Sequence, residues 1–169
     1  KITSSIASAA QSKVYTFDLT GTAWLYFDAI DEPSLNWTLS GAGGTVASRS
    51  FASSDGYNFG SSNPLVTVAA GSYTLTIGGS TDWTGDYAFR LSDLRASASA
   101  TAIDLDATVT GTLSPVRETD VYKFDAVAGE RYYFDVQSYS GYYQAVYRLI
   151  DPAGNQVWGG YAWPDDRDV

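Results

Sequence analysis

Cysteine, histidine and methionine are absent from all 169 residues of the chain. Without histidine and cysteine, the common nucleophile–base pairs, thiolate metal sites and imidazole acid–base groups cannot form. The serine-hydrolase motif G-x-S-x-G is also missing, although serine is abundant. We therefore expect a protein that is not an enzyme and that requires no cofactor.

Basic residues are few, because ten Lys and Arg stand against nineteen Asp and Glu and give a net charge of −9. Such a charge repels phosphate backbones and anionic membrane surfaces, so we expect no nucleic acid partner. A run of about twenty apolar residues is also lacking, and we expect no membrane insertion. An acidic chain without sulfur and rich in Ser, Thr, Gly and Tyr suits an extracellular or bacterial cell-surface location.

What the chain does contain is an internal repeat. Residues 14–30, VYTFDLTGTAWLYFDAI, align without a gap with residues 121–137, VYKFDAVAGERYYFDVQ, at an offset of 107. Seven of the seventeen positions are identical, where unrelated segments would share about one. We predict two tandem units, over residues 1–95 and 96–169. At this offset, most of the N-terminal strand of the first unit and the C-terminal hairpin of the second unit fall outside the chain.

Apolar and polar residues alternate within the repeated segment, which predicts strands with one buried face. We expect a hairpin that pairs Phe17 with Phe27 and leaves Asp28 opposite Thr16 on the exposed face. The second copy is expected to form the same hairpin over residues 121–137.

Residues 71–77 and 85–91 alternate in the same way and predict a second hairpin, while residues 47–63 predict a loop packed on the body around Phe51. The residues expected to point inward are Tyr73, Leu75, Ile77, Tyr87, Phe89 and Leu91, and in the second unit Ile103, Leu105, Ala107 and Val109. Short strands separated by turns, with no amphipathic helix, predict an all-β fold. We expect tandem antiparallel β-sandwich or jelly-roll repeats, the second copy being incomplete.

These segments also resemble a known family. The second copy contains G-x-L, E-T-D-V-Y-K-F-D-A, A-G-E-x-Y-x-F-D-V and L-I-D-P-A-G-N, and the first contains G-S-Y-T-L-T-I and G-D-Y-A-F-R-L. Together they resemble two tandem copies of the bacterial pre-peptidase C-terminal (PPC-like) domains. The resemblance implies small, generally non-catalytic β-sandwiches that accompany secreted proteases or form arrays on secreted and surface proteins, with roles in secretion, adhesion and substrate or matrix binding. The first copy departs from the pattern, since Ser-Gly-Ala-Gly-Gly replaces the Asp-Pro-x-Gly-Asn turn.

A group of oxygen-bearing side chains near the end of the chain could bind calcium, since Ca²⁺ prefers carboxylate and amide oxygens on loops. Its members are Asp151, Asn155, Asp165, Asp166 and Asp168. The alternative, which we favour, is a turn that starts at Asp151-Pro152 and a solvated acidic tail.

Aromatic residues concentrate in the second copy, where rings on loops could stack on the faces of sugars. The candidate binding residues are Tyr139, Tyr142, Tyr143 and Trp158, near Tyr161 and Trp163. The alternative, again favoured, is that these rings cover a sandwich core or a contact between repeats.

Two pairs of aspartates recur in both copies, Asp18 with Asp125 and Asp28 with Asp135, and resemble the paired carboxylates of glycosidases. We reject this interpretation, because strand parity puts Asp28 on the exposed face with no cleft beside it. Charges that keep sheet edges from pairing explain the pattern better.

The sequence thus predicts a non-catalytic extracellular repeat module of a bacterial secreted, surface or fibre-forming protein, acting in spacing, attachment or assembly. Its expected partners are neighbouring repeats of the same or another copy of the protein. One alternative is an adhesin-like carbohydrate- or matrix-binding module assisted by Ca²⁺. Another is an accessory domain of a secreted protease.

Overall fold

Strands dominate the computed structural model, which describes residues 1–31, 33–55, 62–78, 82–115, 117–138, 140, 145–161 and 167–168. The strands are β1 (Ile2–Ile6), β2 (Ser12–Leu19), β3 (Ala23–Ala29), β4 (Asn36–Gly41), β5 (Gly44–Ser50), β6 (Val66–Val68), β7 (Gly71–Gly78), β8 (Gly85–Asp93), β9 (Thr101–Ala102), β10 (Tyr122–Lys123), β11 (Tyr133–Phe134), β12 (Val146–Ile150), β13 (Gln156–Tyr161) and β14 (Arg167–Asp168). Two 3-10 helices, η1 (Phe51–Ser53) and η3 (Ser97–Ser99), complete the set. No helix among the described residues is long and apolar enough to span a membrane.

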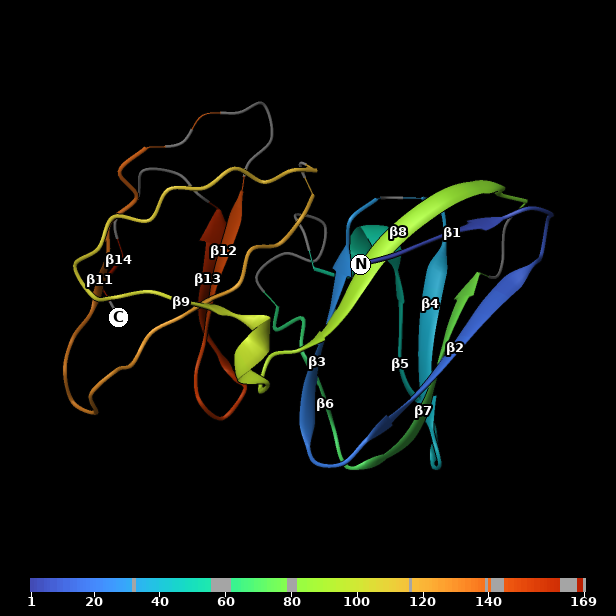
Figure 1. Cartoon of the computed structure of the whole chain (residues 1–169), viewed down its shortest axis with the longest axis horizontal. Helices are drawn as coiled ribbons and strands as arrows, with labels where there is room; N and C mark the ends of the chain where they lie inside the picture. Colours follow the sequence, from blue (N-terminus) through green and yellow to red (C-terminus); the bar gives the residue numbers. More distant parts are fainter. Residues whose placement is uncertain are drawn as a thin grey trace.

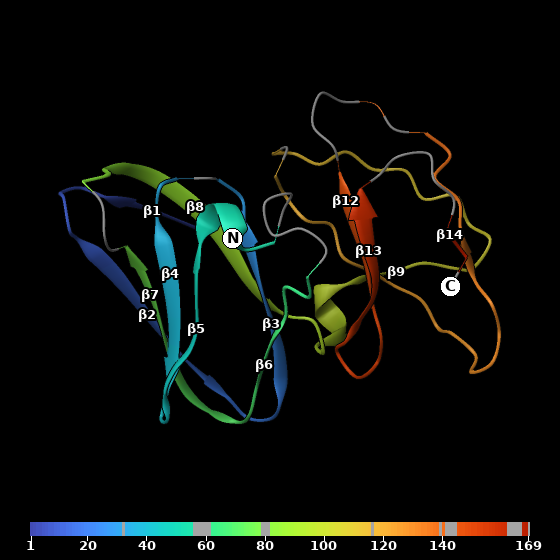
Figure 2. The same ribbon diagram turned by 180° about the vertical axis from the view of Figure 1, so that it is seen from behind.

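The first half of the chain is a β-sandwich, which confirms the predicted all-β class (Figure 1). One antiparallel sheet has the strand order β1-β8-β3-β6 and the other has the order β2-β7-β4-β5. The second half, from β9 onward, lies beside the sandwich, and η3 lies between the two halves (Figures 1 and 2). The division into tandem repeats stays a prediction.

The predicted hairpin over residues 14–30 is wrong, because its two strands belong to different sheets. Phe17 on β2 pairs with Tyr73 on β7, whereas Phe27 on β3 pairs with Leu91 on β8. Residues 20–22 therefore carry the chain across the sandwich from one sheet to the other. The predicted hairpin of residues 71–77 with 85–91 is wrong for the same reason, since β7 and β8 also lie in opposite sheets. Alternation gives the buried face of a strand but not its partner, so the two arrangements have the same sequence pattern.

The predicted inward faces are confirmed in the first half. Leu75, Ile77, Tyr87 and Phe89 are all buried, and Tyr73 and Leu91 pack against the core from partly exposed positions. Phe27 lies at the centre, with ring centroids 4.8 Å from Trp37 and 4.9 Å from Phe89 in stacked arrangements. Such aromatic pairs add about 0.5–1.5 kcal/mol each beyond the area that they bury.

The segment after β5 packs on the body, as predicted, in its described part. Phe51 is buried and meets Phe27 edge-on, with ring centroids 5.2 Å apart. Trp37 donates a hydrogen bond from Nε1 to Ser54 Oγ at 2.6 Å, and the backbone N–H of Ala29 donates to Asp55 Oδ2 at 2.8 Å. These bonds satisfy polar groups that would otherwise be buried without partners.

The second half is built differently in its described part. β9 pairs with β10 in parallel, β11 pairs with β14, and β12 pairs with β13. The predicted hairpin over residues 121–137 is therefore wrong here too, because β10 and β11 do not pair with each other. The prediction that Leu105 and Val109 point into a core is also wrong, since both side chains are exposed. In the described chain, every fully buried hydrophobic residue lies between Ile6 and Phe89, so nothing comparable to the first core covers these two side chains.

Candidate functional site

The turn between β12 and β13 contains two of the predicted calcium ligands, Asp151 and Asn155. Asp151 Oδ1 accepts hydrogen bonds from the backbone N–H groups of Ala153 and Asn155, each at 2.8 Å, and Oδ2 accepts one from Asn155 Nδ2 at 3.1 Å. These bonds, led by the one from the Asn155 backbone, lower the pKa of Asp151. The carboxylate thus holds the turn in shape, as in the alternative that we favoured.

The other predicted calcium ligands are not brought to this turn in the described part of the chain. Asp165 and Asp166 lie outside the described residues, and for Asp168 only the backbone is described, in β14 opposite Tyr133. No three acidic side chains among the described residues come together as a metal site would require. Calcium binding stays a prediction.

Trp158 is the one predicted sugar-binding residue whose side chain is described. It is half-buried on β13, and its ring stacks on Phe134 with centroids 6.1 Å apart and an interplanar angle of 30°. Tyr139, Tyr142 and Tyr143 lie outside the described residues, as does Trp163, and only the backbone of Tyr161 is described. The carbohydrate platform therefore stays a prediction.

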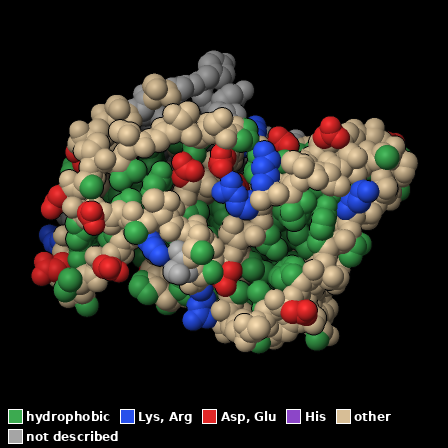
Figure 3. Space-filling view, viewed as in Figure 1, with side chains coloured by type: hydrophobic (Ala, Val, Ile, Leu, Met, Phe, Trp, Pro, Cys, Tyr) green, Lys and Arg blue, Asp and Glu red, His purple; other side chains and the backbone are tan. Residues whose placement is uncertain are grey.

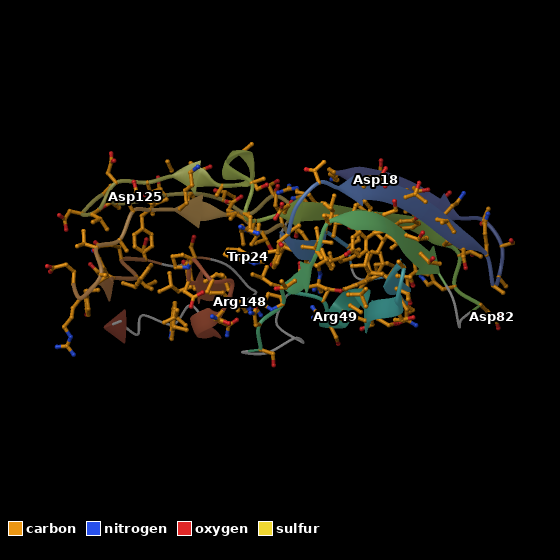
Figure 4. All side chains as sticks on the ribbon, turned by 90° about the horizontal axis from the view of Figure 1, so that it is seen from below. Asp18, Trp24, Arg49, Asp82, Asp125 and Arg148 are labelled. Carbon is orange, nitrogen blue, oxygen red and sulfur yellow. The ribbon has the colours of Figure 1, made fainter. Side chains whose placement is uncertain are left out.

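The outer face of β3 is where the two halves of the chain meet. Odd-numbered residues of β3 face the core, so Trp24, Tyr26 and Asp28 lie in a row on the opposite face. We call the contact between this row and the second half the joint. Figure 4 shows Trp24 and Arg148 at the boundary between the halves.

At one end of the joint, the Asp151–Asn155 turn contacts Trp24. Gly154 has φ of +85°, and a Cβ atom there would lie 2.7 Å from Trp24 Cε2, closer than real Cβ atoms approach. The Gly154 carbonyl accepts a hydrogen bond from Asn63 Nδ2 at 2.8 Å. The Arg95 guanidinium also lies over the Trp24 ring, 5.4 Å from its centroid. Only glycine fits this backbone conformation so close to an indole.

At the other end of the joint, polar groups link β3 and β8 to residues 118 and 119. The Tyr26 hydroxyl and Thr119 Oγ1 are 3.0 Å apart and share a hydrogen bond. Arg90 Nη2 donates to Glu118 Oε1 at 2.5 Å, and Arg90 Nη1 lies 3.7 Å from Asp28 Oδ2. Burial is the main cause that raises the pKa of Tyr26, with the nearby Asp55 carboxylate second.

Asp28 is buried, and its prediction as an exposed residue is wrong. The residue is 1% exposed, and neither carboxylate oxygen accepts a hydrogen bond of good geometry in the described structure. Burial raises the pKa of Asp28 to about 6, while Arg90 and then Thr119 act in the opposite direction. Parity placed Asp28 correctly on the outer face, but the second half covers that face. The related residues Asp18, Asp125 and Asp135 are exposed.

A pocket of about 360 Å³ opens beside this end of the joint. Tyr26, Asp28 and Arg90 line it from the sandwich, and Thr119 and Asp120 line it from the second half. Hydroxyl groups of Ser92, Ser99 and Thr101 complete a polar wall. Acidic and basic side chains lie together where the halves meet in Figure 3. The pocket therefore offers hydrogen-bonding groups and an ion pair to water or a small polar molecule.

Comparisons of the chain with family models, with curated protein sequences and with solved structures give no match. The resemblance to the PPC-like domains stays a prediction that rests on the quoted motifs.

Sequence reasoning missed the joint, although some of its residues were in view. Asp28 and the Asp151–Asn155 turn had been singled out, but neither had been connected to the other half of the chain. Thr119 and Arg90 belong to quoted motifs, E-T-D-V-Y-K-F-D-A and G-D-Y-A-F-R-L, in which they had no assigned role. The available signal was a row of Trp, Tyr and Asp on one face of a strand, since large aromatic rings on an outer face mark a contact.

Proposed function

We propose that the chain is a non-catalytic β-sandwich repeat module that sets the spacing and orientation of consecutive units in an extracellular bacterial protein. The observation that carries this proposal is the joint. Consecutive domains joined only by a linker move independently by default, unless a built interface holds them. Here the second half contacts the sandwich at two places, Trp24 and the Tyr26–Asp28 end of the same strand.

The two contacts together resist rotation better than either one alone. Trp24 and Asp28 are four residues apart on an extended strand, a separation of about 13 Å. The turn at Gly154 docks at one point and residues 118–119 dock at the other. Two fixed points on one rigid strand define the direction of the second half as well as its distance.

A shared irregularity supports the assignment of the halves as repeats. The β4–β5 pair has a register shift between Leu39 and Ser40, and the β12–β13 pair has one between Leu149 and Ile150. These positions correspond at an offset of 110, which is the offset of 107 with a three-residue insertion. Bulges at equivalent positions are typical of related strand pairs.

The absence of native cysteine makes the joint directly measurable. Thr45→Cys and Asp125→Cys change one exposed residue in each half, so spin labels at these positions report the distance between the halves. We expect a single narrow distance distribution. Gly154→Ala should broaden it, because the added methyl group would overlap Trp24.

Gly129→Ala is the matched control, since Gly129 has a similar φ of +90° and nothing within 4 Å of the added methyl group. It should leave the distribution narrow. A broad distribution in the chain that carries only the two labels would mean that the halves move independently, and the spacing function would lose its support.

A further inference from the structure

Side chains of the second half are exposed where their counterparts in the first half are buried. Leu113 is 37% exposed, whereas Ile6, its counterpart at the offset of 107, is 2% exposed. Tyr147 is 44% exposed, whereas Trp37, at the offset of 110, is 2% exposed. Hydrophobic side chains are visible on the surface of the second half in Figure 3. The two halves thus have similar apolar patterns but different degrees of cover.

In the first half, the cover comes from the two strands β7 and β8. β7 lies between β2 and β4, and β8 lies between β1 and β3. Trp37 is paired with Ile77 of β7, and Ile6 is paired with Gly85 of β8. Each of these strands is therefore an inner strand that joins two others into a sheet.

The second half has the outer strands of this arrangement without the inner ones in its described part. β10 is the counterpart of β2 and pairs with β9, while β12 is the counterpart of β4 and pairs with β13. β11, the counterpart of β3, pairs only with the short β14, and residues 109–113, the counterpart of β1, form no strand. Two inner strand positions, one in each layer, are therefore open in the described second half.

We propose that the second half binds a separate pair of polypeptide strands patterned like β7 and β8, one between β10 and β12 and the other between residues 109–113 and β11. Backbone hydrogen bonds along the open strands would supply affinity, and burial of alternate apolar side chains would supply selectivity. This inference does not depend on the proposed joint.

Charge specifies the partner further. In the first half Asp28 is opposite Arg90 of β8, with 3.7 Å between Oδ2 and Nη1. Asp135 is the counterpart of Asp28, and it is exposed and accepts a hydrogen bond from Gln137. The incoming strand therefore carries alternating aromatic or aliphatic residues and a basic residue opposite Asp135.

A second copy of this chain does not fit as the donor of these strands. Its own β7 and β8 contribute Leu75, Ile77 and Phe89 to the centre of the first core, and all three are essentially inaccessible to solvent. Giving up either strand would expose that core, at several kcal/mol for each large side chain. The donor is therefore a polypeptide segment that is not already part of a completed sandwich.

The test is to append a copy of residues 64–94 after Val169 through a flexible Gly/Ser linker and to measure backbone amide exchange by mass spectrometry. We expect exchange in residues 109–113 and in β10, β11 and β12 to slow by at least about tenfold, because exchange there requires the new strands to leave. Exchange in β2, β3 and β4 should stay the same.

Two controls keep the outcome specific. A fusion of equal length, with serine at the positions that copy Leu75, Ile77 and Phe89, should give no protection. Asp135→Arg should reduce the protection by the intact copy several-fold, and an aspartate at the position that copies Arg90 should restore it. Equal exchange in the intact and serine fusions would overturn the proposal. Protection that grows with the concentration of the unfused chain would also overturn it, since a second copy would then be the occupant.

Discussion

Replacement of Asp28 by asparagine should stabilise the protein at neutral pH, although it removes half of an ion pair. The buried carboxylate has a pKa of about 6, against 3.8 for its ordinary value. The folded state therefore binds the proton more tightly than the unfolded state. The contribution of Asp28 to the free energy of unfolding is fully present below about pH 4 and is lost as the pH rises through 6.

The magnitude follows from the size of the shift. A difference of about two pKa units, at about 1.36 kcal/mol each, corresponds to roughly 3 kcal/mol. Asparagine has the same shape and no charge, so Asp28→Asn should gain stability relative to the parent between pH 4 and pH 7, approaching about 3 kcal/mol. Arg90 is not left without a carboxylate in the variant, because its Nη2 still donates to Glu118.

Urea unfolding of both proteins at several pH values from 4 to 7.5 provides the assay, since the difference between them cancels the titration of all other groups. Asp18→Asn is the control, because it makes the same charge change at an exposed position. The difference for Asp18→Asn should vary little with pH. If Asp28→Asn is instead less stable than the parent by an amount that grows as the pH rises, the ion pair with Arg90 outweighs burial and the reasoning is refuted.

Three further substitutions test the sandwich, each by its free energy of unfolding in urea. Phe51→Ala should cost about 3–5 kcal/mol, because Phe51 is buried against Phe27; a much smaller loss would mean that η1 is not part of the core. Asp55→Ala should cost about 1–3 kcal/mol, because it removes the acceptor for the buried Ala29 N–H, while Asp31→Ala at an exposed site should cost little. Gly78→Ala should cost more than Gly44→Ala, although both have positive φ, because only at Gly78 would the methyl group meet backbone, 2.6 Å from the Gln11 carbonyl oxygen. Equal losses at the two glycines would contradict the close approach of β7 to Gln11.

Much of the first half could be predicted from the period-two pattern, because that pattern depends only on which face of a strand is buried. It identified Leu75 and Phe89 as inward-facing residues without any knowledge of their partners. Pairing could not be predicted in this way. A short turn such as residues 20–22 can join neighbouring strands of one sheet or cross to the opposite sheet, and the alternation on either side is the same.

The candidate site was harder to predict for a different reason. Parity places Asp28 on the outer face of β3, and for an isolated sandwich that face would be wet. Its burial depends on Thr119, which is 91 residues away in sequence and lies across the joint. The Asp151–Asn155 turn was predicted from local chemistry, because Asp-Pro sequences start turns wherever they occur. Its contact with Trp24 depends on the tertiary structure and has no local signature.

The position of β3 between the core and the joint limits which substitutions the chain can tolerate. Most strands of a sandwich have one permissive face, and β2 follows that rule with alternately exposed and half-buried residues. Along β3 the odd-numbered residues meet the core and the even-numbered residues meet the second half, so neither set is exposed. A saturation scan of the chain should therefore recover a period of two along β2 and a continuous block of intolerant positions along β3. The same scan with the second half removed should restore tolerance at Trp24, Tyr26 and Asp28 alone.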